Sequence, residues 1–423
     1  MGIGQWKDPA DNSRTKGSLE YYTWLAKLAD KGKITSIFFA DTYAVMDTYE
    51  GRGHGSFSAG MHAMARVSKN VGFGITGSTS YITPYLLART WATLDHATKG
   101  RLAWNVVTSY SESAAKAMGA TSAIPHDESY AQADEYMDLM YSLWEGSWED
   151  AHPSPQRTPV LFQAGASASG KQFAGKHAEA IFCDSTDMKK LAEFVREVRA
   201  IAVEIGRAAT DVNFFPMIAP SVGRKMEEAQ ASQAKHDRYE KNADWEGGLA
   251  TISSFMNIDF SKFPVDEPFD VEGLKERSSA IHSLINSAKN FAEHEGKPLT
   301  PRMLGHAFAF CGIADVFESF INEADVDGFN VAYVSNPESY EDLVELLIPV
   351  LMERGIMWKD YTVPGGTFLA RFRYEELKER LGTDEFGDIT IKRTRTEKKV
   401  DGVVNGVRKL EVGETAEAVV AKA

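Results

Sequence analysis

The chain has 423 residues, of which 43% are hydrophobic, and its formal net charge is −14. This length fits one large domain or two ordinary ones, and the acidic balance argues against nucleic acid and anionic membranes as main partners. The two cysteines, Cys183 and Cys311, lack the spacing of a disulfide framework or a structural zinc site. No apolar run is long enough to span a bilayer, and the N-terminus lacks a signal-peptide core, so we expect a soluble cytoplasmic protein.

Short apolar runs alternate with amphipathic helices along the chain and predict an α/β fold. In chain order, the predicted strands cover residues 34–41, 71–80, 101–109, 158–167, 179–185, 212–223 and 326–335, and the predicted helices cover 19–32, 58–70, 84–100, 126–146, 170–178, 187–206 and 313–324. Alternation of this kind forms parallel βαβ units, and nearly continuous apolar strands are typical of a sheet covered on both faces.

Polar residues at the carboxyl ends of these strands favour a TIM (β/α)8 barrel. Asp41, Thr76, Ser109 and Ser167 stand at or near such ends. In a barrel, this face carries the ligand sites. A doubly wound sheet is the alternative, because strand count alone does not separate the two folds.

Two segments depart from the alternation. Residues from about 225 to 311 are helical and charged, with Pro264 and Pro268 midway, and we expect a helical insertion packed against the barrel. Residues 386–423 are charged and then rich in Ala and Val, which is typical of an extended, flexible tail. The predicted organisation is one barrel domain over residues 1–385, followed by this tail.

The stretch GFGITG, residues 72–77, fits the dinucleotide-binding pattern G-x-G-x-x-G. That pattern needs a strand before the glycines and a helix directly after them. Here a polar helix precedes the glycines, and the next helix begins only at Pro84. We therefore expect the glycines to lie inside a strand, where glycine marks close packing or close backbone approach.

The stretch GASASGKQ, residues 165–172, is similar to a P-loop. Its last residue is Gln172, where Ser or Thr would hold Mg²⁺. A predicted strand precedes it and a predicted helix follows, so its backbone amides are placed to bind an anion at a helix N-terminus. The pattern predicts phosphate binding rather than nucleotide hydrolysis, and a plain turn of small residues is the alternative.

Five longer stretches are distinctive as a set: GKITSIFFAD, GFGITGSTSYITPYLLARTWATLDHATKGRLAWNVVTS, HDESYAQADEYMDLMYSLWEGSWED, SPQRTPVLFQAGASASGKQFAGKHAEAIF and ADVDGFNVAYV. Together they resemble the nitrilotriacetate monooxygenase family. This is the branch of the bacterial-luciferase-like flavin monooxygenases that also contains dibenzothiophene-sulfone and pristinamycin-type monooxygenases. The likeness runs from about Gln5 to Leu381.

The resemblance implies a barrel that binds reduced FMN without a covalent link. A separate NAD(P)H-dependent flavin reductase supplies the FMNH₂, O₂ adds to it, and the resulting peroxyflavin oxygenates a small organic substrate. The resemblance also implies a homodimer or a higher homo-oligomer. No metal is expected in the site.

The resemblance also implies which residues bind the flavin. They are Asp41, Thr76, Asn105, Ser109, His126, Tyr130, Gly165, Ala166 and Ser167. Asp41 and Thr76 would lie beside the ring system. His126 and Tyr130 are four residues apart at a helix start, so they share one face and would contact the ribityl-phosphate side. Gly165, Ala166 and Ser167 would offer amides and a hydroxyl to the phosphate.

Simpler roles are open for several of these residues. Asp41 could cap the following segment, and His126 could be a polar residue at a helix start. Asn105 and Ser109 could form strand-end hydrogen bonds only. The tryptophans at positions 91, 104, 144 and 148 are expected in the core or a pocket wall. Catalytic residues beyond flavin binding are not assigned.

The chain departs from the family pattern in ways that bear on activity. The family's first apolar strand is expected to be absent, because the chain begins almost at Trp6, and the long stretch that follows SWED in the family is replaced by AHP. A barrel without a strand has two unpaired edges. A flavin-binding relic without turnover is therefore one alternative function, and a P-loop-type nucleotide-binding protein is another. Four tyrosines near the expected mouth, at positions 43, 49, 81 and 110, favour an apolar or aromatic substrate.

Overall fold

A parallel sheet forms the centre of the computed structural model. The structure describes residues 4–44, 48–50, 61–146, 154–183, 187–220, 238–239, 241–269, 299–309, 317–361, 364–366, 368, 394–400 and 403–409. The sheet consists of β1 (Ser36–Phe39), β2 (Gly72–Ser78), β3 (Leu102–Val107), β4 (Val160–Gln163), β5 (Ala180–Cys183), β6 (Asn213–Ile218) and β7 (Asn330–Val331). All seven fall within the predicted strands, and every neighbouring pair is parallel.

The strands follow one another in the order β1-β2-β3-β4-β5-β6-β7. A doubly wound sheet would reverse its strand order at a switch point, whereas sequential order is that of a barrel. The structure thus contains a parallel half-barrel of seven strands, and the strand order favours the predicted barrel over its alternative. Among the described residues, β7 makes no strand pairing with β1.

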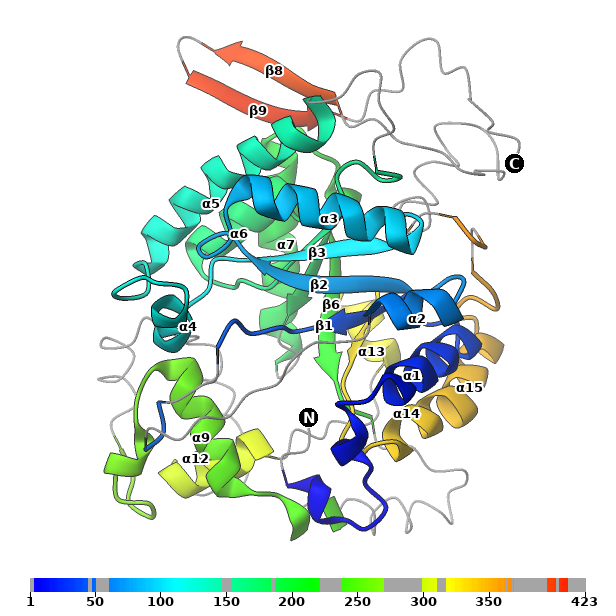
Figure 1. The fold of residues 1–423 in the computed structure, drawn as a ribbon, viewed down its shortest axis with the longest axis vertical. Coiled ribbons are helices and arrows are strands. Elements are labelled where there is room, and N and C mark those ends of the chain that lie inside the picture. The colour runs from blue at the N-terminus through cyan, green and yellow to red at the C-terminus, as the bar shows by residue number, and fades with distance from the viewer. Residues whose placement is uncertain are drawn as a thin grey trace.

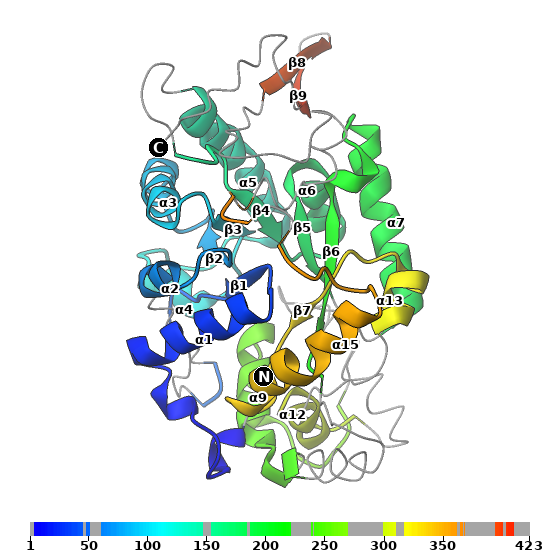
Figure 2. The same cartoon turned by 90° about the vertical axis from the view of Figure 1, so that its right-hand side faces the viewer.

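Helices such as α3, α5 and α7 cover the outer side of the sheet, whereas α9 and α12 lie together apart from these covering helices (Figures 1 and 2). The described helices are α1 (Leu19–Lys31), α2 (Met61–Val67), α3 (Pro84–Thr98), α4 (Glu112–Ala117), α5 (His126–Tyr141), α6 (Ala168–His177), α7 (Met188–Glu204), α9 (Trp245–Met256), α12 (Pro301–Ala309), α13 (Phe317–Ala324), α14 (Glu338–Asp342) and α15 (Ile348–Glu353), with π-helical turns at η3 (Ser142–Gly146) and η7 (Leu343–Leu347). Among the described residues, no helix combines the length and apolar character that a membrane crossing requires.

Local sequence explains where several helices begin. The side chains of Ser18, Ser167 and Asp187 accept hydrogen bonds from backbone amides in the first turns of α1, α6 and α7. Helix α3 begins with Pro84, whose missing N–H is one of the groups that a first turn leaves unpaired. These starts follow from side-chain chemistry within three residues, so a single sequence is enough to predict them.

The core between sheet and helices is aromatic. Trp104 of β3 lies against Trp91, Tyr136 and Trp144 at ring-centroid distances of 5.8–6.3 Å. The indole N–H of Trp104 donates to Gly77 O, and that of Trp144 donates to Ala88 O. The expectation of core tryptophans is confirmed for these three, and Trp148 lies outside the described residues.

Aromatic rings also fill the inner side of the sheet. Phe162 of β4 lies 5.2 Å from Phe182 of β5, which in turn lies 4.4 Å from Phe38 of β1. A Cβ atom at Gly74 of β2 would stand only 2.7 Å from the Phe162 ring. The glycine in GFGITG therefore makes room for a core ring, and the whole motif lies inside β2 as predicted.

Helix α1 closes the gap between the two ends of the sheet on the outer side. Leu28 of α1 belongs to the same apolar cluster as Val344 and Ile348, which follow β7 in the chain. Tyr361 donates its hydroxyl hydrogen to Ile34 O, just before β1. Side chains thus connect the two sheet edges where strand pairing does not.

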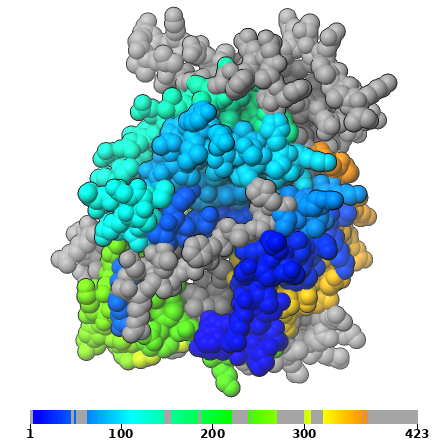
Figure 3. Space-filling view, in the orientation of Figure 1, coloured from blue at the N-terminus to red at the C-terminus, as the bar shows by residue number. Residues whose placement is uncertain are grey.

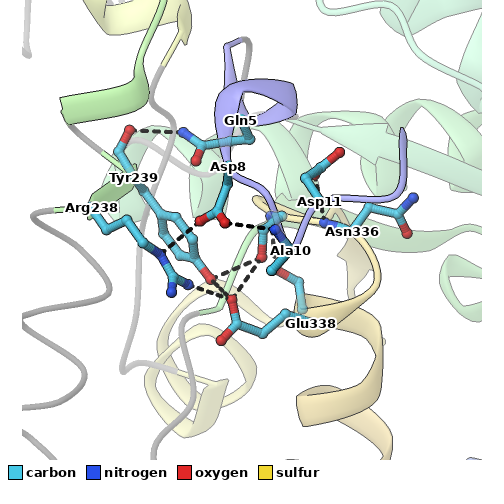
Figure 4. A network of polar contacts seen from close by, with 10 residues as sticks. Gln5, Asp8, Ala10, Asp11, Arg238, Tyr239, Asn336 and Glu338 are labelled. Carbon is cyan, nitrogen blue, oxygen red and sulfur yellow. Dashed lines mark hydrogen bonds and ion pairs between the residues drawn. The ribbon is translucent and has the colours of Figure 1, made fainter. Parts of the chain in front are cut away.

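A polar network holds the N-terminal segment against the residues that follow β7 (Figure 4). Arg238 contacts Asp8 at 3.1 Å and Glu338 at 2.6 Å. Tyr239 donates to Glu338 over 2.8 Å, and its carbonyl accepts a hydrogen bond from Gln5. In the space-filling view, the N-terminal segment accordingly lies beside the region of α14 and α15 (Figure 3).

Helices α9 and α12 lie between β6 and β7 in the chain, within the range predicted as a helical insertion. They share a buried cluster that includes Leu249, Phe260 and Leu304. Within the range predicted as a tail, residues Thr394–Val400 and Val403–Lys409 pair as the antiparallel strands β8 and β9. An Asp-Gly pair separates these two segments, and that sequence is typical of a hairpin.

Candidate functional site

A strand-end cluster lies at the carboxyl ends of β2 and β3. Thr76 and Asn105 are register partners on these strands, and both are buried. The Asn105 amide donates to Thr76 Oγ1 over 3.0 Å, and the Thr76 hydroxyl donates to Phe39 O over 2.9 Å. The Asn105 Oδ1 atom has no hydrogen-bond partner among the described residues. A buried amide oxygen without a partner indicates a place where a ligand donor or a water binds.

Ser109 extends the strand-end cluster from β3 towards β2. Its hydroxyl donates to Ser78 Oγ over 2.8 Å. Its φ angle is 60°, in the left-handed region that non-glycine residues rarely occupy. Such backbone strain gathers at functional sites, where the surrounding structure holds it in place.

Asp41 stands two residues after the end of β1, and one of its carboxylate oxygens accepts a hydrogen bond from Thr42 N. The nearby Tyr43 hydroxyl accepts the Ser78 amide hydrogen over 3.0 Å. Burial raises the pKa of Tyr43 to about 12, with a smaller contribution from the charge of Asp41, so the phenol stays neutral. Asp41 therefore stands at the same edge of the sheet as the strand-end cluster.

A helix-end cluster lies where α5 and α6 begin. His126 and Tyr130 of α5 have their ring centroids 5.1 Å apart, which confirms that they share one helix face. Burial raises the pKa of Tyr130, although hydrogen bonds with the side chains of Ser167, Thr108 and Gln163 oppose this shift. The phenol of Tyr130 thus reaches the loop that precedes α6.

That loop exposes backbone donors at a helix start. Ser167 caps α6 by accepting from Gly170 N over 3.0 Å. None of the amides of Gly165, Ala166 and Ser167 donates a hydrogen bond to another described residue. A Cβ atom at Gly165 would lie 2.5 Å from the Tyr130 hydroxyl, so only glycine allows this approach. Free amides at a helix N-terminus form an anion site.

The two clusters meet between β3 and β4. Thr108 precedes Ser109 in the chain, and its side chain is one of the hydrogen-bond partners of Tyr130. Its carbonyl accepts a hydrogen bond from Ser80, which follows β2. The structure therefore brings the predicted residues into two groups at one edge of the sheet. Asp41, Thr76, Asn105 and Ser109 form the first, and His126, Tyr130, Gly165, Ala166 and Ser167 form the second.

Comparison with known proteins identifies the family. Residues 4–269 match the model of the luciferase-like monooxygenases, and the chain is 34% identical over 410 residues to dimethyl-sulfide monooxygenase of Hyphomicrobium sulfonivorans, covering 84% of each chain. The chain belongs to the luciferase-like monooxygenase family. The resemblance predicted from the motifs is confirmed, since nitrilotriacetate and dibenzothiophene-sulfone monooxygenases are also relatives, at 27% and 29% identity.

Solved structures agree with this membership. The crystal structure of DmoA from Hyphomicrobium sulfonivorans superposes with a TM-score of 0.77 at 32% identity, covering 87% of this chain and 88% of its own. A riboflavin lyase, solved with modified FMN and its substrate riboflavin, gives a TM-score of 0.75 at 28% identity, covering 90% of this chain and 93% of its own.

Sequence reasoning missed several residues of this family member's site. Gln163, the last residue of β4, is buried, and its Oε1 has no hydrogen-bond partner among the described residues. Ser78 and Thr108 complete the contacts of Ser109 and Tyr130. Gln163 belongs to the stretch TPVLFQAGASASG, and a polar residue at the end of an apolar strand is the signal that points to it.

Lys171 shows why the P-loop likeness is misleading. The strand before GASASGK and the helix after it are both present, as predicted. The Lys171 ammonium, however, forms an ion pair with Glu197 of α7 and lies over the Phe194 ring. A P-loop lysine must reach the bound phosphates. Here that charge is held on the outer side of α6, so the structure does not support nucleotide hydrolysis.

Aromatic residues surround the strand-end cluster. Tyr43 and Tyr81 pack edge to face at 5.9 Å, and Tyr110 packs against Phe255 of α9 at 6.1 Å. The Tyr81 hydroxyl donates to Ser111 O, and burial raises the pKa of both Tyr81 and Tyr110. Tyr49, predicted with them, is instead buried in the cluster of α9 and α12.

Proposed function

We propose that this chain is an FMNH₂-dependent monooxygenase that oxygenates a small organic substrate with O₂. A separate NAD(P)H-dependent flavin reductase supplies the reduced flavin, and a homodimer or higher homo-oligomer is the proposed assembly. Support comes from the family, whose named relatives include two-component enzymes such as nitrilotriacetate monooxygenase component A. The observation that carries the proposal is the group of amides at the start of α6 that donate to no other described residue, in a loop whose Gly165 lies against the Tyr130 hydroxyl.

The residues of the helix-end cluster fit the phosphate end of FMN. Three amides that donate to no other described residue, the Ser167 hydroxyl and the positive end of the α6 dipole all favour a doubly charged anion. Tyr130 adds a neutral phenol donor, because burial raises its pKa. His126 stands beside it on the same helix face.

The strand-end cluster fits the flavin ring system. A flavin ring presents both hydrogen-bond donors and acceptors along its edge. Asn105 Oδ1 is a buried acceptor that has no partner among the described residues, and Thr76 beside it is fixed by its bond to Phe39 O. A planar heterocycle placed here would pair the amide of Asn105 and so remove the cost of leaving its oxygen unsatisfied.

Bound reduced FMN would supply the two electrons that reduce one oxygen atom of O₂ to water while the other oxygen atom enters the substrate. The protein's own residues bind, orient and exclude water. Thr76 and Asn105 fix the ring edge, and Tyr130 with Ser167 fixes the phosphate. Tyr43, Tyr81 and Tyr110 keep neutral phenols beside the strand ends, and two of them are tied to the backbone, so their rings form a rigid apolar border. This border favours an uncharged apolar substrate.

The proposal is tested by flavin binding before turnover. FMN and photoreduced FMNH₂ are titrated into the protein, and fluorescence quenching is followed. Ser167→Asp keeps an N-cap on α6, now a carboxylate in place of the hydroxyl, but places negative charge against the phosphate, and we expect FMN binding to weaken about 100-fold. Ser167→Asn keeps the cap without the charge and serves as the matched control. Absence of FMN binding to the wild-type chain would contradict the proposal.

Turnover is then measured with a flavin reductase, NADH and FMN, with oxygen incorporation as the readout. Dimethyl sulfide, dibenzothiophene sulfone and nitrilotriacetate, the substrates named for three relatives, form the first panel. Oxygenated product from one of the neutral compounds would support both the proposed activity and the preference for an uncharged apolar substrate. FMN binding with oxygen uptake but no product from a wider panel would instead favour a flavin-binding relic.

A further inference from the structure

We infer that Asp134, His177 and Tyr141 form a latch that holds α5 against α6, so that the two helix starts meet the same phosphate group. The inference rests on the proposed function and assigns His177 as a positioning residue for flavin phosphate. His177 is the last residue of α6, at the opposite end of the helix from the loop at Gly165, and no sequence-based prediction gives it a role.

The latch is made of two short hydrogen bonds, of which the one to Tyr141 is buried and the one to Asp134 is partly buried. His177 Nε2 lies 2.7 Å from Asp134 Oδ1, and His177 Nδ1 lies 2.8 Å from the Tyr141 hydroxyl. The His177 side chain is almost fully buried. Because a carboxylate only accepts, the ring donates from Nε2 to Asp134 and its Nδ1 atom can accept from Tyr141. Lys176 adds an ion pair to Asp134.

The polar contacts hold the carboxylate charged. Burial by itself raises the pKa of Asp134, but the hydrogen bonds from His177 and Lys176 outweigh it and bring the pKa to about 2. A histidine that bonds to a fixed carboxylate on one side and a phenol on the other has one orientation. The last turn of α6 is therefore fixed in position and rotation relative to α5.

A line of aromatic rings connects the latch to the phosphate loop. His177 lies 4.7 Å from Phe173, Phe173 lies 5.8 Å from Tyr130, and Tyr130 lies 5.1 Å from His126, all between ring centroids. Near the helix starts, Ser169 donates to Asp127 over 2.7 Å. The interface between α5 and α6 is thus in contact along its length.

The position of the latch along α5 and α6 explains how it fixes the first residues of the two helices relative to each other. At about 1.5 Å per residue, Asp134 lies about 12 Å along α5 from His126, and His177 lies about 15 Å along α6 from Ser167. The helices run side by side with nearly matched depths (Figures 1 and 2). A Cβ atom at Gly165 would lie only 2.5 Å from the Tyr130 hydroxyl, so the loop and the phenol are in close contact. A shift of α6 along its axis would break this contact.

The test compares FMN with riboflavin, which has the same ring system but no phosphate. His177→Phe keeps a ring against Phe173 and removes both hydrogen bonds. We expect FMN to bind about 10-fold more weakly to this variant, and riboflavin to bind within about twofold of the wild type. His177→Gln restores a donor towards Asp134, and we expect it to recover most of the FMN affinity.

The control is Val344→Ala, which removes packing between η7 and α1, remote from α5 and α6. Thermal unfolding measures the loss of stability in each variant. Val344→Ala should leave the ratio of FMN affinity to riboflavin affinity unchanged. Equal weakening of both flavins by His177→Phe, no weakening of either, or no recovery in His177→Gln would overturn the inference. A wild-type chain that binds both flavins equally well would instead contradict the proposed phosphate site.

Discussion

The strand-end cluster and the helix-end cluster are built in opposite ways. At the strand ends, side chains make the site, and they are held by packing inside a half-barrel: Thr76 and Asn105 are buried above a layer of phenylalanine rings. At the helix ends, backbone amides and a hydroxyl make the site, and polar contacts between two outer helices hold it.

This difference predicts which kind of change should weaken the strand-end cluster and which should weaken the helix-end cluster. Packing is sensitive to volume, because a close-packed core leaves no space for an added atom. Hydrogen bonds and ion pairs at a half-exposed interface are sensitive to protonation instead. The flavin ring and its phosphate should therefore respond to different substitutions. Three predictions test this, in order of expected effect.

The largest effect is expected from Gly74→Val beneath the strand-end cluster. Its side chain would meet the Phe162 ring, where the built Cβ atom already approaches to 2.7 Å. We expect the free energy of unfolding in urea to fall by about 3 kcal/mol, because the ring is buried and cannot move aside. Gly17→Ala, where a Cβ atom meets nothing within 4 Å, is the control and should change little. Equal stability of the two variants would mean that the inner layer is loosely packed.

Asn105→Leu removes the polar amide at nearly constant volume. We expect FMN and riboflavin to lose affinity by the same factor, about 30-fold or roughly 2 kcal/mol, because the contact is with the ring that both share. Titration of both flavins measures this directly. A loss confined to FMN would place Asn105 on the phosphate side and would contradict the division between the two clusters.

A smaller effect is expected from acid at the helix-end cluster. The folded-state pKa of Asp134 is about 2, below the usual value of 3.8. A depressed carboxylate pKa stabilises the fold above the unfolded value, and this contribution is lost as the pH falls from about 4 towards 2. Asp134→Asn should therefore cost about 1 kcal/mol at pH 6, after allowance for solvent screening, and about a third of that at pH 2.5, where the folded carboxylate is still partly ionised.

Urea unfolding at the two pH values measures this loss. Glu135→Gln, one residue along α5 and exposed, is the matched removal of a carboxylate. It should show no such dependence. A cost for Asp134→Asn that stays the same at both pH values would show that charge plays no part in the latch.

Local signals accounted for much of the architecture. Apolar runs gave the seven strand positions, and caps such as Ser167 gave helix starts, because both depend on residues close together in the chain. The same logic placed GFGITG inside a strand and GASASGK between a strand and a helix. The Asp-Gly pair near residue 401 was an equally local signal for the β8–β9 hairpin, but the surrounding charge favoured a tail instead.

What the sequence by itself determined was which residue types stand at strand and helix ends, together with the family that their motifs resemble. The tertiary structure decided which of them meet. Gly74 faces a ring on β4, Ser109 adopts a left-handed backbone to reach Ser78, and His177 finds its carboxylate 43 positions away in the chain. Such pairings depend on how strands align and helices dock, and that arrangement has no periodic signature in a single sequence.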